Sequence, residues 1–254
     1  MATIFRFVLS CLIALSIPIG SSATDNVEHR KRLSKHYCLE KPEGQGLFPA
    51  VMLVSGCNGF DSKFMKARYD RVQSLLVESG FVTLRVNYLA ARNVSTCWPE
   101  VPPEEVAGDI RIAAEHLRQK PFVKQGAINV LGWSWGGAGA LLAIGHTDSR
   151  EPAPIDAVVA YYPSCFYMQR WDSEVPVLVL VGAIDNIAPF SDCEKLFGKL
   201  SKPHKVIIRV YDNAHHCFDN SDLPAEMKKD FGTIGYNKTA AESAWSEVIN
   251  FLRK

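Results

Sequence analysis

The sequence predicts a single α/β domain, built as a mostly parallel β-sheet with helices on both faces. Short apolar runs of strand length recur along the chain and alternate with longer segments of helical periodicity. A strand that is buried on both faces has a continuous apolar sequence, and strands that alternate with helices are typical of parallel sheets. The chain has 254 residues, of which 47% are hydrophobic, so one large core is expected.

The N-terminal segment predicts export. Residues 1–6 carry one positive charge, residues 7–19 are mostly apolar, and residues 21–23 are small. This pattern is typical of a signal peptide, and the apolar run is short for a membrane span. We expect cleavage after residue 23, no stable membrane anchor, and a periplasmic or secreted protein. Residues 24–36 are polar and predict a mobile leader, followed by one domain over 37–254.

The elements of this domain follow from the apolar runs and from the glycines and prolines that separate them. Strands are expected at 37–40, 49–54, 81–87, 127–131, 157–161, 175–181 and 205–210. Helices are expected at 69–76, 104–117, 138–143 and 240–252. In such a sheet, functional residues gather in the loops at the carboxyl ends of the strands.

The segment Gly132-Trp133-Ser134-Trp135-Gly136 matches the G-x-S-x-G elbow of α/β-hydrolases. It follows an apolar strand and begins a helix of small residues, which is the context that the elbow requires. Ser134 is therefore the candidate nucleophile, and the backbone N–H of Trp135 is a candidate oxyanion donor at the helix N-terminus. The alternative is an incidental glycine and serine turn.

A serine nucleophile needs a base and an acid that orients the base, and in this fold they follow it in the order acid, then histidine. Asp185 follows an apolar strand and is the candidate acid, with a plain turn residue or helix cap as the alternative. The adjacent His215 and His216 follow the last strand, and only one of them is expected to reach Ser134. The second oxyanion donor is expected in loop 55–59, at the N–H of Cys57, unless this loop is an ordinary glycine turn.

The composition gives little support for other ligands. A formal net charge of +1 does not favour nucleic acid, and the Cys and His residues lack zinc-site spacing. We therefore expect no metal, no cofactor and no nucleic-acid partner.

Cysteine usage points to disulfides. Of the seven cysteines, Cys11 lies in the predicted signal peptide. The other six are Cys38, Cys57, Cys97, Cys165, Cys193 and Cys217. An even number in an exported chain favours disulfides. Cys57 is expected to pair with Cys97, because both lie at the carboxyl ends of neighbouring strands. Cys193 could pair with either Cys165 or Cys217, and buried free thiols are the alternative.

Three motifs together resemble the dienelactone hydrolase family, over most of residues 37–253. They are the elbow ending in Gly136-Gly137, the G-x-x-D-x-x-x-P loop at 182–189, and the Y-x-x-A-x-H-x-F segment at 211–218. The resemblance implies the α/β-hydrolase fold and places His216, rather than His215, at the catalytic position.

Two departures from the family pattern bear on the substrate. Founding members use a cysteine nucleophile where this chain has Ser134, and they hold a substrate carboxylate with two arginines. Arg92 could match the first arginine with a one-residue shift, but Asn220 occupies the second position. We expect Arg92 and Trp133 to contact a small ester or lactone whose acyl group is neutral or held by one arginine. Trp98, Trp135 and Phe218 fit either an aromatic pocket or the core.

The function that these residues predict is hydrolysis of carboxylic esters or lactones through an acyl-enzyme. One alternative is a peptidase or amidase of the same fold, which ranks lower because the sequence shows no propeller or other large gating domain. The other is a binding protein that keeps the fold without catalysis. Reaction with a fluorophosphonate would separate the last alternative from an enzyme, because only an activated serine reacts quickly.

Overall fold

The computed structural model describes residues 23–145, 153–198 and 205–253, so the predicted signal peptide lies outside the described residues except for Ala23. A seven-stranded sheet has the order β1-β3-β2-β4-β5-β6-β7, and only β1 is antiparallel to its neighbour. Its strands are β1 Tyr37–Glu40, β2 Phe48–Val54, β3 Val82–Val86, β4 Val123–Trp133, β5 Ala157–Tyr161, β6 Val177–Gly182 and β7 Val206–Tyr211. The predicted fold class is confirmed.

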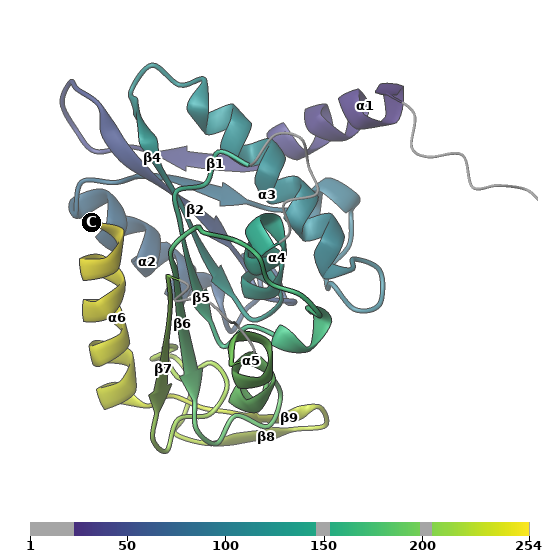
Figure 1. The fold of residues 1–254 in the computed structure, drawn as a ribbon, viewed down its shortest axis with the longest axis vertical. Helices are drawn as coiled ribbons and strands as arrows, with labels where there is room; N and C mark the ends of the chain where they lie inside the picture. The colour runs from purple at the N-terminus through teal and green to yellow at the C-terminus, as the bar shows by residue number, and fades with distance from the viewer. Residues whose placement is uncertain (1–22, 146–152, 199–204, 254) are drawn as a thin grey trace, which may run out of the picture.

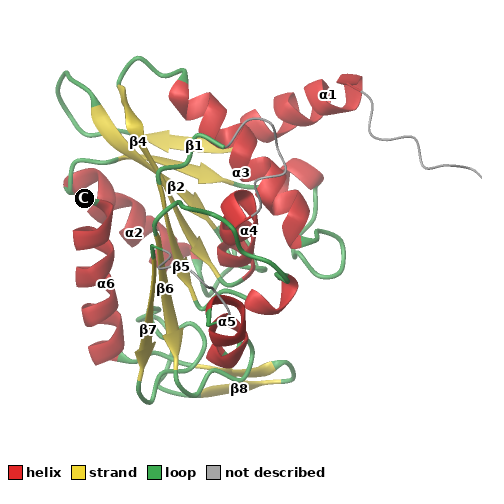
Figure 2. Ribbon diagram, viewed as in Figure 1, coloured by secondary structure: helices red, strands yellow, loops and turns green. Residues whose placement is uncertain are grey.

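Helices cover both faces of the sheet (Figures 1 and 2). They are α1 Ala23–Ser34, α2 Lys66–Glu78, α3 Pro103–Arg118, α4 Trp135–Gly145, α5 Phe190–Phe197 and α6 Lys238–Leu252. Residues of α1, α3, α4 and α5 share one hydrophobic core with one face of the sheet. Residues of α2 and α6 share a second core with the opposite face. The central strands are buried on both faces, which explains their continuous apolar sequences.

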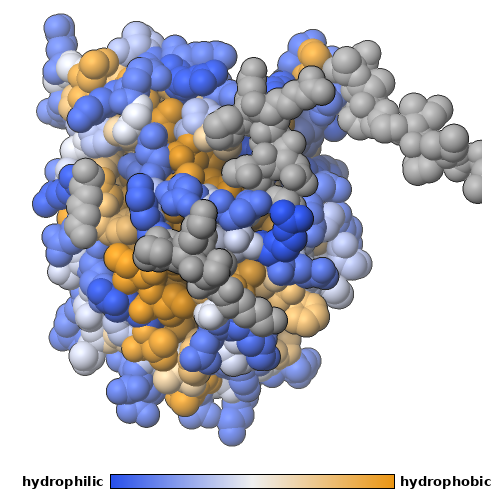
Figure 3. Space-filling view, viewed as in Figure 1, coloured by the Kyte–Doolittle hydropathy of each residue, from blue (hydrophilic) through white to orange (hydrophobic). Residues whose placement is uncertain are grey.

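The middle of the sheet positions the elbow. Gly132, near the end of β4, pairs with Val54 of β2 on one side and Ala160 of β5 on the other. Figure 3 shows hydrophobic residues gathered over the lower half of the face viewed, where β6 and the edge strand β7 lie beside α5. In the part of the chain that the structure describes, no helix has the length and apolar character needed to cross a membrane.

The segment expected to be a mobile leader is largely helical, because α1 spans most of residues 24–36. Leu33 of this helix is fully buried, and His29 hydrogen-bonds to Asp109 of α3. The sequence analysis expected a mobile leader, whereas the structure describes a helix that is anchored by the buried Leu33. A helix of this composition is held by its tertiary contacts more than by its own propensity.

A short hairpin near the C-terminus was also not expected. Strands β8 Met227–Lys229 and β9 Gly232–Ile234 pair as an antiparallel ribbon. Ile234 forms an isolated bridge with His216, and the N–H of Gly235 donates to the His216 carbonyl oxygen at 3.0 Å. The hairpin thus supports the backbone of a candidate site residue. Its sequence lacks the alternation of apolar and polar residues by which strands are predicted.

Two disulfides are present among the described residues. Cys57 bonds to Cys97 with a Cα–Cα distance of 4.7 Å, which confirms the predicted pair. Cys165 bonds to Cys193 with a Cα–Cα distance of 5.0 Å, which decides between the two partners considered for Cys193. Cys38 and Cys217 are free thiols, the first exposed and the second buried.

We expect the Cys57–Cys97 bond to stabilise the fold measurably. It closes a loop with a sequence separation of 40, and in the chain-entropy model such a loop contributes about 4 kcal/mol to the free energy of unfolding. The double variant Cys57→Ala, Cys97→Ala should therefore unfold at a lower denaturant concentration in an equilibrium titration. Cys38→Ala is the matched control, because Cys38 is exposed and unpaired. Equal midpoints for the double variant and the wild type would contradict this prediction.

Candidate active site

Three loops at the carboxyl ends of β4, β6 and β7 bring the predicted site residues together. Ser134 lies between β4 and α4 and has a φ of 51°, a left-handed conformation that residues with a side chain rarely adopt. A Cβ at Gly132 would lie 2.5 Å from the carbonyl oxygen of Gly136, and one at Gly136 would clash with the backbone of Val54 and Ser55. Both glycines are therefore required for this turn.

Ser134, His216 and Asp185 form a continuous chain of hydrogen bonds. The Ser134 Oγ lies 2.9 Å from His216 Nε2, and His216 Nδ1 lies 2.7 Å from Asp185 Oδ2. The other oxygen of Asp185 accepts from the backbone N–H groups of Ile187 and Ala188 at 2.8 and 2.9 Å. These donors fix the carboxylate, which in turn fixes the orientation of the imidazole. His216 and Asp185 are buried, at 4% and 6% exposed.

The neighbouring His215 does not take part in this chain of hydrogen bonds. Its Nδ1 is buried and has no hydrogen-bond partner among the described residues. His216 instead packs its ring against Tyr162, with 4.4 Å between the ring centroids. The geometry therefore agrees with the expectation that only one of the two adjacent histidines reaches Ser134.

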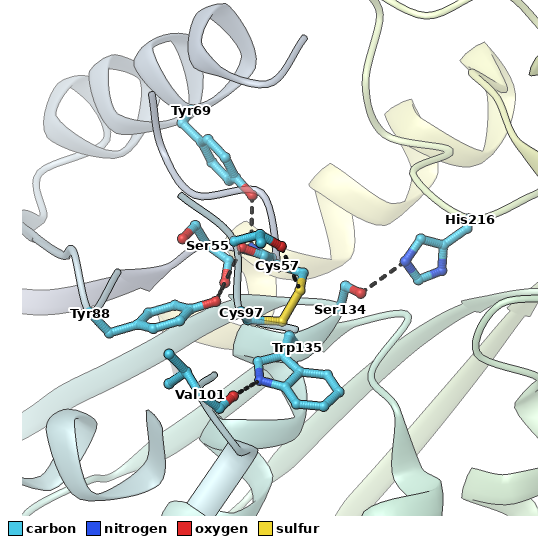
Figure 4. The surroundings of a disulfide bond; sticks show 11 residues. Ser55, Cys57, Tyr69, Tyr88, Cys97, Val101, Ser134, Trp135 and His216 are labelled. Carbon is cyan, nitrogen blue, oxygen red and sulfur yellow. Dashed lines mark hydrogen bonds between the residues drawn. A yellow bond between two sulfur atoms is a disulfide. The ribbon is translucent and has the colours of Figure 1, made fainter. Parts of the chain in front are cut away.

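The loop that carries Cys57 lies beside Ser134 and is held from several sides (Figure 4). The Tyr69 hydroxyl accepts from the N–H of Gly56 at 3.0 Å, and the Tyr88 hydroxyl donates to the Ser55 and Gly56 carbonyl oxygens. The Cys57 carbonyl oxygen accepts from the N–H of Cys97 at 3.0 Å, next to the disulfide between them.

The opposite side of the elbow is anchored through Trp135, at the first turn of α4. Its indole Nε1 donates to the carbonyl oxygen of Val101 at 2.8 Å (Figure 4). The N–H groups of Cys57 and Trp135 donate no hydrogen bond within the described part of the chain.

A cavity of about 640 Å³ opens above Ser134. Its lining combines the site residues with an aromatic group that comprises Tyr69, Trp98, Trp133, Trp135, Tyr162, Phe166, Tyr167 and Phe231. Cys57 and His216 also line it. A volume of this size suits a small organic molecule.

A sequence model of the dienelactone hydrolase family matches residues 38–254. The chain belongs to the dienelactone hydrolase family. A curated relative from Bradyrhizobium sp., whose name is "Probable 2-oxo-3-(5-oxofuran-2-ylidene)propanoate lactonase", is 25% identical over 240 residues, which cover 85% of this chain and 87% of the relative. This membership identifies the protein as an ester or lactone hydrolase.

Solved structures share the fold. A dienelactone hydrolase-like promiscuous phosphotriesterase from metagenomic libraries superimposes with a TM-score of 0.63 and 18% identity, over 85% of this chain and 91% of its own. Thermogutta terrifontis esterase 2 phosphorylated by paraoxon superimposes with a TM-score of 0.61 and 17% identity, over 85% and 87% of the two chains. Both agree with the α/β-hydrolase architecture of this dienelactone hydrolase family member.

The family resemblance suggested that Arg92 contacts substrate, but the structure places Arg92 outside the lining of the cavity. Its guanidinium forms ion pairs with Asp109 and Glu105 of α3 and donates to the Tyr88 carbonyl oxygen. Trp133, the other residue expected to bind substrate, does line the cavity. Phe218 does not, and packs in the core.

The cation that does line the cavity is Arg68 of α2, which the sequence analysis did not identify. It is 3% exposed and donates to Asp219 at 3.1 Å and to the Tyr162 hydroxyl at 2.7 Å. Asp219 also accepts from the indole N–H of Trp133 at 2.9 Å. Burial alone would lower the pKa of Arg68, but Asp219 and Tyr162 outweigh it, so the pKa lies well above its usual value and the guanidinium stays charged. The sequence feature that could have identified Arg68 is its place on the apolar face of a helix, one position before Tyr69.

Cys217 also lines the cavity, next to His216 in sequence. Burial raises the pKa of its thiol to about 12. At neutral pH this thiol is protonated and therefore a weak nucleophile. Cys217 therefore does not supply the cysteine nucleophile that the founding family members use.

Proposed function

We propose that this dienelactone hydrolase family member cleaves carboxylic esters or lactones through an acyl-enzyme on Ser134. The observation that carries the proposal is the hydrogen-bond chain from Ser134 through His216 to Asp185. Such a chain lets a neutral hydroxyl act as a nucleophile, because the base accepts its proton as the new bond forms.

In this mechanism the Ser134 Oγ attacks the ester carbonyl carbon while His216 Nε2 takes the hydroxyl proton. Asp185 stabilises the imidazolium that results. The carbonyl oxygen becomes an oxyanion, and the N–H groups of Cys57 and Trp135 are the proposed donors to it. His216 then protonates the departing alkoxide, and the acyl group remains on Ser134. A water molecule, deprotonated by His216, attacks the acyl-enzyme and releases the acid and the free serine.

The proposed substrate class draws on the relatives as well as on the site. The name of the Bradyrhizobium relative specifies a lactone, and the Thermogutta structure is that of an esterase. A small cyclic or open ester is also compatible with a cavity of about 640 Å³. Opening a lactone and cleaving an open ester require the same nucleophile and oxyanion donors.

A fluorophosphonate probe tests this proposal directly. The wild-type protein should be labelled within minutes, and peptide mass spectrometry should place the adduct on Ser134. Ser164→Ala is the matched control, because Ser164 also lines the cavity but forms no hydrogen bond to His216. It should be labelled at the wild-type rate. Absence of labelling in folded wild-type protein would reject the proposal and favour a binding protein that keeps the fold.

We also propose that the protein is exported, with residues 1–23 removed. The two disulfides support export, because such bonds persist in oxidising compartments. N-terminal sequencing of the protein recovered from the periplasm or medium of an expressing bacterium should begin at Thr24. Recovery of uncleaved protein from the cytoplasm alone would contradict this proposal.

A further inference from the structure

Three aromatic side chains at the cavity are unusually exposed for their size. Trp98, Phe166 and Phe231 are 64%, 73% and 62% exposed, yet all three line the cavity above Ser134. They belong to three separate segments of the chain: the loop before α3, the 3-10 turn Cys165–Tyr167, and the turn between β8 and β9. We call these three residues the aromatic rim. Large apolar groups exposed together around a cavity indicate a binding function.

Two residues of the aromatic rim are held in place by the disulfides. Trp98 follows Cys97, which is bonded to Cys57, and Phe166 follows Cys165, which is bonded to Cys193. Their rings also rest on further aromatic residues of the lining. Trp98 contacts Trp135 edge to face at 6.2 Å between centroids, and Phe166 contacts Tyr167 at 5.7 Å. A rim fixed in this way loses little conformational entropy when a ligand binds.

The cavity offers little net charge to an anionic substrate. Its cation, Arg68, is paired with Asp219, and both side chains are buried, at 4% and 9% exposed. The guanidinium lies 4.4 Å from the Tyr69 ring and 5.2 Å from the Trp133 ring, so its faces are covered as well. Asp192 also lines the cavity, and its carboxylate is paired with Lys195 at 3.3 Å, so it adds no positive charge there.

From these features we infer that the preferred substrates are uncharged esters or lactones that carry an aryl group, with the aryl ring bound by the aromatic rim. This inference rests on the proposed esterase function and adds the substrate class. Aromatic rings stack on one another or meet edge to face with favourable energy. A substrate carboxylate would lose its hydration in the cavity without gaining a free cation.

Paired substrates test the inference, with acid release measured by titration at constant pH. The acyl side is compared with methyl 3-phenylpropanoate and methyl butanoate, and the alcohol side with benzyl acetate and ethyl acetate. We expect kcat/KM to be about tenfold higher for the aryl ester in at least one pair, since modest apolar contacts discriminate by such factors. Hydrolysis of the small esters without an aryl preference in either pair would overturn the inference and leave the proposed function intact. Hydrolysis of none of them would count against the proposed function itself.

Variants of the aromatic rim test whether the aryl ring of the substrate binds there. Trp98→Ala and Phe166→Ala should raise KM for the preferred aryl ester by a larger factor than KM for its small partner. Phe64→Ala is the control, since Phe64 is 55% exposed but does not line the cavity. An aryl preference that survives both rim variants would show that the ring binds elsewhere and overturn the assignment to the rim.

The charge of the cavity is tested with monomethyl succinate, in which a carboxylate replaces the terminal methyl group of methyl butanoate. Wild type should prefer methyl butanoate by about tenfold, since the carboxylate loses its hydration without finding a free cation. Asp219→Asn removes the negative partner of Arg68 and should shift the ratio toward monomethyl succinate. A wild-type preference for monomethyl succinate would overturn the inference, because Arg68 would then act as a carboxylate anchor. An unchanged ratio in folded Asp219→Asn would show that the ion pair does not set the selectivity.

Discussion

Replacing Ser134 with alanine is expected to lower kcat for ester hydrolysis by about four orders of magnitude or more, the range found for nucleophiles of serine triads. The change removes the oxygen that forms the acyl bond, so no remaining group can take its place. Ser164 forms no hydrogen bond to His216 among the described residues, and the thiol of Cys217 is protonated at neutral pH. The measurement is the initial rate with a chromogenic ester at saturating concentration, for wild type and Ser134→Ala.

The folded structure of Ser134→Ala should be unchanged, because the hydroxyl hydrogen-bonds only to His216 among the described residues. Its circular dichroism spectrum and unfolding midpoint should match those of the wild type. Residual activity above a few per cent, in protein prepared without wild-type contamination, would remove Ser134 from the proposed mechanism. A folded but inactive Ser134→Ala variant would show that the activity depends on the Ser134 hydroxyl.

His216→Ala is expected to be nearly as damaging as the serine substitution, whereas His215→Ala should reduce kcat only slightly. His216 Nε2 is the atom within hydrogen-bond distance of Ser134 Oγ, at 2.9 Å, and His215 has no role in that chain of hydrogen bonds. Removing the base leaves the serine proton without an acceptor as the acyl bond forms. Rates of fluorophosphonate labelling, measured alongside ester hydrolysis, report on activation of the serine alone.

The two histidine variants control for each other, since the residues are adjacent and both substitutions remove an imidazole from the same loop. Loss of activity in both variants together with a lowered unfolding midpoint would indicate damage to the loop. The assignment of the base fails if His215→Ala loses labelling while His216→Ala retains it.

Much of the fold could be predicted because its signals are local. The apolar runs at 37–40 and 157–161 coincide with β1 and β5, and the other core strands differ from their predicted ends by a few residues. Burial on both faces forces such strands to be apolar throughout, so their sequences are distinctive. The hairpin β8–β9 and the helix α1 were missed, because each depends on a few contacts with distant parts of the chain.

The sequence by itself determined the seven strands of the main sheet, the Ser134 elbow with its two required glycines, and the likeness to the dienelactone hydrolase family. These depend on patterns within short segments. Only the tertiary structure decided that Arg68 rather than Arg92 lines the cavity, that Cys193 pairs with Cys165, and that three exposed aromatic residues surround one opening. Arg68 and Asp219 are 151 positions apart, and no local pattern records such a pair. The packing of α2 beside the His216 loop excludes water from both side chains. Each buried charge therefore needs the other as its partner.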